Sequence, residues 1–209
     1  NRRAVYDRTR AAAYALRHWD DPNPRFANMD TLGGGGDCTN FTSQALLAGG
    51  WPMDYRGTGY DREWWYLRMG QDRFDAAGDD WWSCTWSLPE NQFQYLRLNP
   101  ATVVDLRRDP SQASRLRLGD LVFYDWNGDG RFDHGAIVTA HDRFGRPLVT
   151  YRTLSPRPPV RNAHWELPFR GPARRIFGAL LVDEPVVHRT APDWTGLSLA
   201  TGGDGPKWT

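Results

Sequence analysis

Helix-forming segments come early in this chain and strand-forming segments come late, and this order most constrains the fold. Residues 2–19 are rich in alanine and carry apolar side chains at helical spacing, so they predict a helix that ends before Pro22. A second helix is predicted to begin at or near Cys38, and the pair Gly49-Gly50 marks its end.

The later part of the chain predicts four β-strands. Four apolar runs have strand length and many β-branched or aromatic side chains: 121–124, 135–140, 147–151 and 177–182. The turn at 142–145 separates the second run from the third and predicts an antiparallel hairpin. Helices followed by strands indicate an α+β fold, in which the helix that starts with Cys38 packs on an antiparallel sheet.

The segment 54–100 is aromatic and polar without a clear period, so we expect loops and short helices, one of them over 90–98. The chain has 11 tryptophans, and five of them fall in this segment: Trp64, Trp65, Trp81, Trp82 and Trp86. Such large rings are costly to expose. They therefore indicate either core packing or a groove in which a sugar or a peptide lies against flat rings.

Composition excludes several classes of partner. The net charge is +1, from 26 basic and 25 acidic residues, so we predict neither a nucleic-acid surface nor a basic membrane anchor. No stretch has the roughly 18–20 apolar residues that a spanning helix requires, so we expect no membrane insertion. The length of 209 residues suits one domain, placed at 1–185, with a loosely ordered tail at 186–209. The sequence predicts no oligomeric state.

Cys38 has the local setting of a cysteine nucleophile. A helix N-terminus offers unpaired backbone N–H groups and the positive end of the helix dipole, which stabilise a thiolate and an oxyanion. The glycine tract at 33–36 allows close approach of a substrate. The alternatives are a structural cysteine and a phosphate loop, although the Gly-Lys-Ser/Thr of a phosphate loop is missing. Cys84 is expected to be a small buried apolar residue; a disulfide with Cys38 would make an inactive form.

Several short motifs follow one another along the chain: Tyr6-Asp7-Arg8, the ten residues 35–44 around Cys38, Trp64-Trp65-Tyr66, Gly119-Asp120-Leu121-Val122 and Asp133-His134-Gly135-Ala136. Together they resemble the putative amidase domain family, which belongs to the papain-like group with the NlpC/P60 and CHAP peptidoglycan hydrolases. The resemblance implies a papain-like fold and a catalytic pair of Cys38 and His134 that requires no cofactor. It also implies peptidoglycan peptides as substrate and an extracellular or cell-envelope location.

His134 is the strongest of five histidines as a candidate base. It begins a predicted strand with apolar neighbours, as suits a group at the rim of a cleft. The other four lie at a helix end, in a turn or in irregular segments, and we expect them to be structural or solvated: His18, His141, His164 and His188.

A third group usually orients the imidazole, and the resemblance implies that it comes from the strand after the histidine. Where a family histidine is expected, this chain has Arg152, which cannot accept a hydrogen bond from imidazole. Then Thr153, Ser155, a backbone carbonyl or a more distant residue orients His134, or the site is weakened.

The segment before His134 resembles part of a calcium-binding loop. Oxygen-bearing side chains fall at positions one, three, five and nine of the EF-hand pattern: Asp125, Asn127, Asp129 and Asp133. Position twelve, normally a bidentate glutamate, is Ala136. The missing ligand favours a polar turn between two strands; the alternative is a calcium ion that would stiffen the connection to His134.

The sequence thus predicts a cysteine-dependent amide hydrolase that acts on peptidoglycan peptides through a thioester intermediate. Three alternatives remain open. The substrate could be a peptide outside the cell wall, an amine could replace water in an acyl transfer, or the domain could bind its ligand without turnover.

Overall fold

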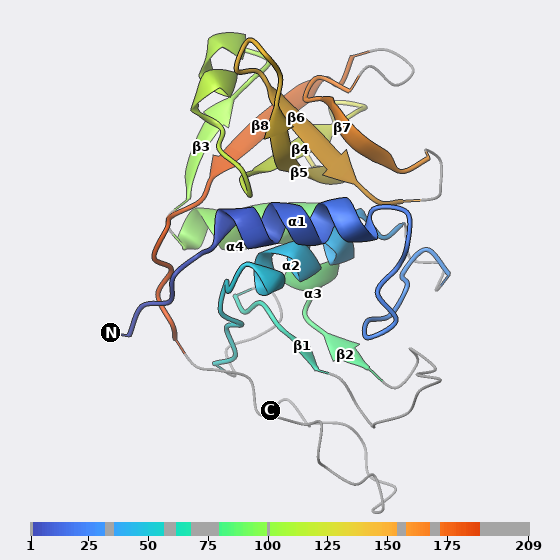
Figure 1. The fold of residues 1–209 in the computed structure, drawn as a ribbon, viewed down its shortest axis with the longest axis vertical. Helices are drawn as coiled ribbons and strands as arrows, with labels where there is room; N and C mark the ends of the chain where they lie inside the picture. Colours follow the sequence, from blue (N-terminus) through green and yellow to red (C-terminus); the bar gives the residue numbers. More distant parts are fainter. Residues whose placement is uncertain are drawn as a thin grey trace, which may run out of the picture.

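A computed structural model describes residues 2–31, 36–56, 62–67, 80–99, 101–153, 158–167 and 172–188. Over these ranges the chain forms a helical layer that lies against a six-stranded antiparallel sheet (Figure 1). The expected α+β class is confirmed. Of the expected tail, 186–188 pack against the N-terminal segment, since Val186 forms a β-bridge with Arg3; the remainder lies outside the described residues.

The sheet has the strand order β3-β8-β4-β5-β6-β7, and each neighbouring pair is antiparallel. Its strands are β3 (Thr102–Asp105), β4 (Leu121–Asp125), β5 (His134–His141), β6 (Pro147–Tyr151), β7 (Val160–His164) and β8 (Arg175–Leu180). The four predicted strands correspond to β4, β5, β6 and β8, and β5 and β6 form the predicted hairpin. The sequence did not predict β3 and β7, because β3 is short and β7 is polar.

The described helices lie on one face of the sheet (Figure 1). They are α1 (Arg8–His18), α2 (Cys38–Ala48), α3 (Cys84–Ser87) and α4 (Pro89–Leu98), and a 3₁₀ helix, η1 (Pro110–Arg115), follows β3. The prediction for α2 is confirmed, but α1 begins at Arg8 rather than at residue 2. The reason is that the Asp7 side chain caps α1 by accepting a hydrogen bond from the Arg10 N–H at 3.0 Å.

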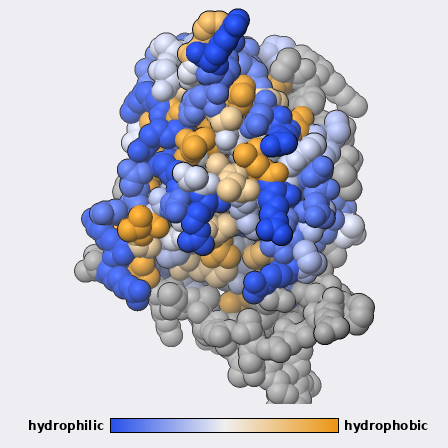
Figure 2. Space-filling model, viewed as in Figure 1, coloured by the Kyte–Doolittle hydropathy of each residue, from blue (hydrophilic) through white to orange (hydrophobic). Residues whose placement is uncertain are grey.

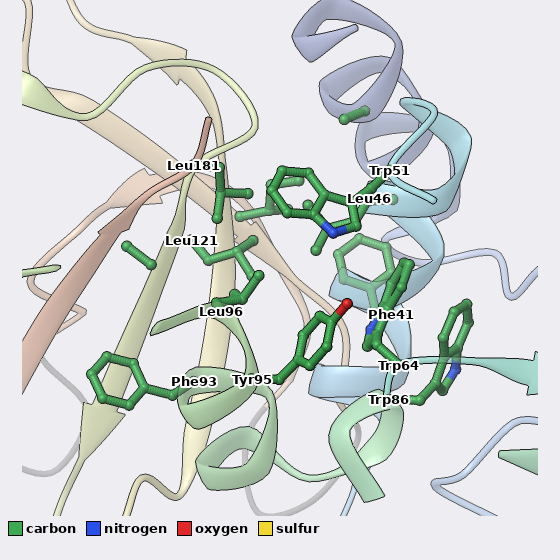
Figure 3. Packing of buried hydrophobic residues seen from close by; sticks show 14 of the residues in the cluster. Phe41, Leu46, Trp51, Trp64, Trp86, Phe93, Tyr95, Leu96, Leu121 and Leu181 are labelled. Carbon is green, nitrogen blue, oxygen red and sulfur yellow. The ribbon is translucent and has the colours of Figure 1, made fainter. Parts of the chain in front are cut away.

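Apolar side chains form a cluster on each face of the sheet. The helix-side cluster lies between the helices and the sheet and includes Phe41, Leu46, Trp86, Phe123 and Ile137 (Figure 3). The far-side cluster covers the opposite face and includes Val122, Tyr124, Ala136, Val138 and Tyr151. Successive residues of β4 and β5 alternate between the two clusters, as the pleat of a strand requires.

The tryptophan-rich segment contributes mainly to the core. Trp64, Trp65 and Trp86 are fully buried, Trp82 is partly buried, and Trp81 is 37% exposed. Trp81 and Trp82 form β2 (Trp81–Trp82), which pairs with β1 (Tyr66–Leu67) in a small second sheet. Core packing therefore accounts for most of these rings, and the expectation of a groove lined by them is not met at the three buried positions.

Two of the short sequence motifs, Tyr6-Asp7-Arg8 and Gly119-Asp120-Leu121-Val122, bind the N-terminal segment to the sheet. The Tyr6 hydroxyl donates a hydrogen bond to the Gly119 carbonyl at 2.7 Å, and the Arg8 guanidinium forms a 2.8 Å ion pair with the buried Asp120. Gly119 has φ +80°, and a Cβ there would lie 2.5 Å from the Tyr6 hydroxyl oxygen. These motifs thus hold the layers together.

The face of the molecule in Figure 2 mixes polar and apolar side chains without one continuous apolar area. In the described ranges, the exposed large apolar side chains are Val5, Trp81, Leu88, Leu98 and Phe144. None of the helices in the described ranges combines the length and apolarity needed to cross a bilayer.

Candidate active site

Cys38 is the first residue of α2, directly after the N-cap residue Asp37. Its side chain is buried, with 5% exposed. The backbone N–H groups of Gly135 and Thr39 donate hydrogen bonds to its Sγ atom, and the Thr39 hydroxyl lies 3.7 Å from that atom. The tertiary fold therefore brings the thiol to the start of β5.

The N–H of Gly135 reaches the thiol because β6 does not cover it. Pairing between β5 and β6 ends at Ile137 and Thr150, two residues beyond Gly135 along β5. The N-terminus of α2 takes the place that β6 leaves, so the thiol lies beside the residue that directly follows His134.

His134 begins β5, and aromatic rings hold its imidazole. The side chain is 4% exposed, and its ring centroid lies 4.2 Å from that of Tyr151, edge to face, and 5.7 Å from that of Tyr124. Both tyrosines belong to the far-side cluster. The imidazole therefore lies on the sheet face away from the helices, while Cys38 meets the backbone of β5 at the next residue.

The surroundings of Cys38 raise the pKa of its thiol. Burial is the largest cause, and the nearby Asp37 carboxylate adds to it; the hydrogen bonds from Gly135 and Thr39 act in the opposite direction. In the free protein this direction opposes the expected stabilisation of the thiolate by the helix N-terminus. A base must remove the proton when the thiol reacts.

We expect Cys38 in the folded protein to react with iodoacetamide only above the usual thiol pKa of about 8.5. Because ionisation is disfavoured in the folded state, the stability that this thiol contributes is present below its unfolded pKa and is lost as the pH rises towards its folded pKa. Alkylation rates measured against pH by mass spectrometry, in buffer and in denaturant, test this. A midpoint lower in buffer than in denaturant would contradict it.

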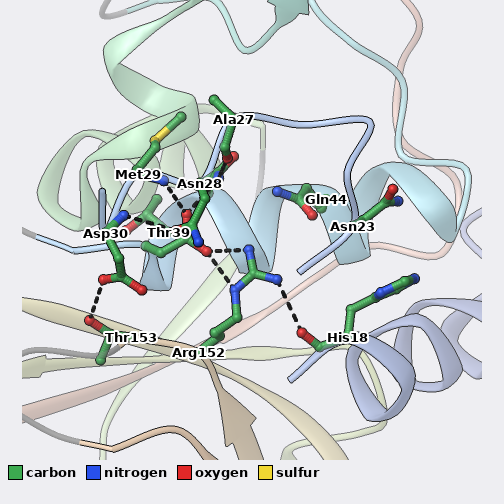
Figure 4. A network of polar contacts seen from close by, with 12 residues as sticks. His18, Asn23, Ala27, Asn28, Met29, Asp30, Thr39, Gln44, Arg152 and Thr153 are labelled. Atoms are coloured by element: carbon green, nitrogen blue, oxygen red, sulfur yellow. Dashed lines mark hydrogen bonds and ion pairs between the residues drawn. The ribbon is translucent and has the colours of Figure 1, made fainter. Parts of the chain in front are cut away.

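Asp37 joins three segments of the chain at the start of α2. One carboxylate oxygen accepts hydrogen bonds from the Met29 N–H at 2.9 Å and from the Asn40 amide at 2.7 Å. The other accepts two from the Arg152 guanidinium, of which that from Nε is 2.6 Å. Figure 4 shows this guanidinium reaching from the sheet to the helical layer, where it also donates to the His18 carbonyl.

Arg152 therefore does not face the imidazole. Its side chain lies on the helix side of the sheet, with its guanidinium carbon 5.4 Å from the Phe41 ring centroid. Of the residues considered as a third group, Thr153 donates a hydrogen bond to Asp30 at 3.3 Å. Ser155 lies outside the described residues. Arg152 thus forms a buried ion pair with Asp37, the residue directly before Cys38.

Polar side chains on α2 are buried and bonded to the neighbouring helices. Trp86 donates from its indole nitrogen to the Asn40 side chain at 2.8 Å. Ser43 accepts hydrogen bonds from Trp64 at 3.0 Å and from Gln92 at 2.8 Å. Sequence reasoning missed these roles, because polar residues on a helix do not by themselves indicate that it is surrounded by protein.

The predicted calcium ligands are used within their own loop. Asp125 accepts hydrogen bonds from the N–H groups of Gly128 and Gly130 at 2.8 and 3.0 Å, and Arg175 lies 3.2 Å from the same carboxylate. Backbone N–H groups of the loop also donate one hydrogen bond each to the side chains of Asn127, Asp129 and Asp133. Over the part of the chain that the structure describes, no three His, Cys, Asp or Glu side chains converge as metal ligands. These residues do not fit a calcium site, and the polar turn explains the pattern.

Calcium is accordingly expected to leave the thermal stability unchanged. The loop oxygens already accept amide hydrogen bonds, and the Arg175 cation beside Asp125 disfavours a second cation there. Differential scanning calorimetry with calcium and with EDTA measures this. An increase in Tm that saturates with calcium, and that Asp125→Asn removes, would contradict it.

The other candidates have structural surroundings. Cys38 and Cys84 are both free thiols, and Cys84 is only partly buried rather than fully buried as expected. Each remaining histidine has a polar neighbour: His18 the Asp21 carbonyl, His141 the Leu116 carbonyl, His164 the Glu166 N–H and His188 the Asn99 side chain. His141 ends β5 rather than lying in the turn.

Comparison with known proteins places these residues in a known family context. The family model described as putative amidase domain matches residues 5–174, which include Cys38 and His134. The uncharacterized protein YhbB of Bacillus subtilis (strain 168) is 36% identical over 155 residues. The match covers 73% of this chain and 43% of YhbB, so the chain spans less than half of that relative. No solved structure matches the chain.

Proposed function

The chain belongs to the putative amidase domain family, and we propose that it is an amidase-type hydrolase whose nucleophile is Cys38. One observation carries this proposal. The thiol lies at the N-terminus of α2 and accepts a hydrogen bond from Gly135, the residue after His134. A thiol at a helix terminus, beside the strand that begins with a histidine, supplies the groups that a cysteine hydrolase needs.

In the proposed reaction, the sulphur of Cys38 attacks the amide carbon while His134 accepts the thiol proton. The tetrahedral oxyanion receives hydrogen bonds from backbone N–H groups at the start of α2. The C–N bond then breaks, the imidazolium gives its proton to the leaving amine, and a thioester remains. Water attacks the thioester, His134 again takes a proton, and the carboxylic acid and the free thiol are released.

His134 acts in this proposal from the first position of β5. At the end of a strand a side chain can reach past the edge of the sheet, and the thiol lies only one residue further along. The packing of Tyr151 against the imidazole, edge to face at 4.2 Å, restricts the ring to few orientations. This restriction supports a role in which the ring position is set before substrate binds.

We propose peptidoglycan peptides as the substrate, in a papain-like fold at the cell envelope or outside the cell. The family description names only an amidase domain and gives no substrate. The support for this substrate is the resemblance of the Cys38 and His134 motifs to those of the NlpC/P60 and CHAP hydrolases. The net charge of +1 offers no competing electrostatic signature for nucleic acid.

Digestion of purified peptidoglycan, alongside short peptide amides, tests the proposal. We expect soluble peptide fragments, with one water added for each amide bond cleaved, and hydroxamates when hydroxylamine is present to trap the thioester. Cleavage of the peptide amides alone would reject the peptidoglycan substrate and keep the mechanism. Binding to peptidoglycan without any cleavage would replace the hydrolase with a binding module.

A further inference from the structure

We propose that Arg152 is a positioning residue for Cys38: its ion pair with Asp37 fixes the first turn of α2 against the end of β6 and balances a buried carboxylate beside the thiol. The expected effect of Arg152 on turnover rests on the proposed function. Its expected effect on the ionisation of the Cys38 thiol does not.

The geometric part of the proposal follows from how Asp37 is held. Asp37 and Arg152 are both buried, and they are 115 residues apart in the sequence. Arg152 directly follows β6, and Asp37 directly precedes Cys38. Two hydrogen bonds from the guanidinium, both to the same Asp37 oxygen, therefore tie the end of β6 to the residue before the sulphur atom, and charge-assisted bonds of this kind are short and strong.

The electrostatic part follows from the charge next to the nucleophile. A buried carboxylate one residue from a thiol disfavours the thiolate, because two negative charges repel strongly where water is excluded. Asp37 acts in this direction on Cys38. A guanidinium bonded to the same carboxylate offsets that repulsion, while loss of the guanidinium would leave the carboxylate uncompensated.

Several other ionisable groups lie near this end of α2, and the variants below leave all of them in place. They come from α1, from the loop before α2 and from the sheet: Tyr14, His18, Asp30, His134 and Tyr151. Tyr14 is near both charges of the pair, and burial raises its pKa to about 12. It is therefore neutral at the pH values at which the thiol is measured.

The test is the pH profile of Cys38 alkylation by iodoacetamide in four variants. Arg152→Gln should move the midpoint up by about 0.5 to 1 pH unit, and Asp37→Asn should move it down by a similar amount. The double variant should return close to the parent, because both charges are then absent. Arg152→Lys keeps the charge, and its alkylation midpoint should lie between those of the parent and Arg152→Gln. The lysine side chain has a single nitrogen and cannot form both hydrogen bonds that the guanidinium makes to Asp37.

Arg8→Gln is the matched control. It breaks a second arginine–aspartate pair, between the partly buried Arg8 and the buried Asp120 at 2.8 Å, which lies near the opposite end of α2 from Cys38. This variant should lose stability and keep the parental alkylation profile. If Arg152→Gln does not fold, Asp37→Asn decides, because the proposal requires a downward shift.

Opposite shifts in the two single variants distinguish this proposal from a merely structural role, because general loosening of the site would move both variants in the same direction. Shifts of the same sign, an unchanged profile in Asp37→Asn, or an equal shift in Arg8→Gln would overturn it. On a substrate of the proposed hydrolase, Arg152→Gln should lower kcat by about tenfold or more, with KM within about twofold. Absence of turnover in the parent would reject the proposed function and leave the alkylation result intact.

Discussion

Replacing Cys38 with alanine is expected to lower amide hydrolysis by on the order of 10⁴-fold or more. The thiol is the group that forms the covalent intermediate in the proposed reaction, and no other cysteine or serine in the described chain accepts a bond from Gly135. The stability should change little, by about 1 kcal/mol, because only one sulphur atom is removed. Hydrolysis of peptidoglycan and urea denaturation measure the two effects.

Cys84→Ala is the control for this variant. Cys84 begins α3 and is also a free thiol, so its replacement removes a sulphur atom without touching the start of β5. We expect parental activity from Cys84→Ala. Activity that survives in Cys38→Ala and is lost in Cys84→Ala would reject Cys38 as the nucleophile. His134→Ala should lose turnover as well, since the raised pKa of Cys38 leaves the thiol dependent on a base.

Trp86→Ala is expected to lower the free energy of unfolding by about 3 to 5 kcal/mol. Trp86 is fully buried, and its ring lies 4.9 Å from Trp64 and 5.3 Å from Tyr66 between centroids. Its indole nitrogen also donates to the Asn40 side chain, which itself holds Asp37. The substitution thus leaves a cavity and removes a hydrogen bond inside the support of the site.

Urea denaturation measures this effect, and Trp81→Ala is the matched control. Trp81 lies in the same aromatic segment but is 37% exposed, so its loss should change the free energy of unfolding by about 1 kcal/mol or less. Equal effects at the two positions would mean that Trp86 does not support the core as the structure indicates.

Local sequence signals predicted the helices and the central strands. The period of apolar residues in α2, and the Gly49-Gly50 pair that ends it, depend on neighbours within a few positions. The same holds for β4, β5, β6 and β8, whose apolar runs are continuous. By contrast, β3 is held by its pairing with β8, a distant segment, and four residues carry too little pattern to reveal it.

The candidate site divides in the same way. The motifs predicted Cys38 and His134 as candidates, and the fold then placed the thiol at Gly135. The ion pair of Arg152 with Asp37 could not be predicted, because the two residues are 115 positions apart and each has an ordinary polar neighbourhood in the sequence. For the same reason the sequence could not decide between a polar turn and a calcium loop: it counts oxygen-bearing residues but does not show which backbone N–H groups bond to them.

The sequence by itself determined the α+β class, the order of the elements and the position of a cysteine at the first residue of a helix. Helix caps, apolar periodicity and glycines at helix ends depend on residues a few positions apart, so they can be recognised in the sequence alone. Only the tertiary structure decided that the thiol is buried with a raised pKa, that Arg152 serves Asp37, and that most of the clustered tryptophans are core. Burial and charge pairing depend on segments that meet only in the folded chain, because the free energy of a charge or a ring is set by what surrounds it in space.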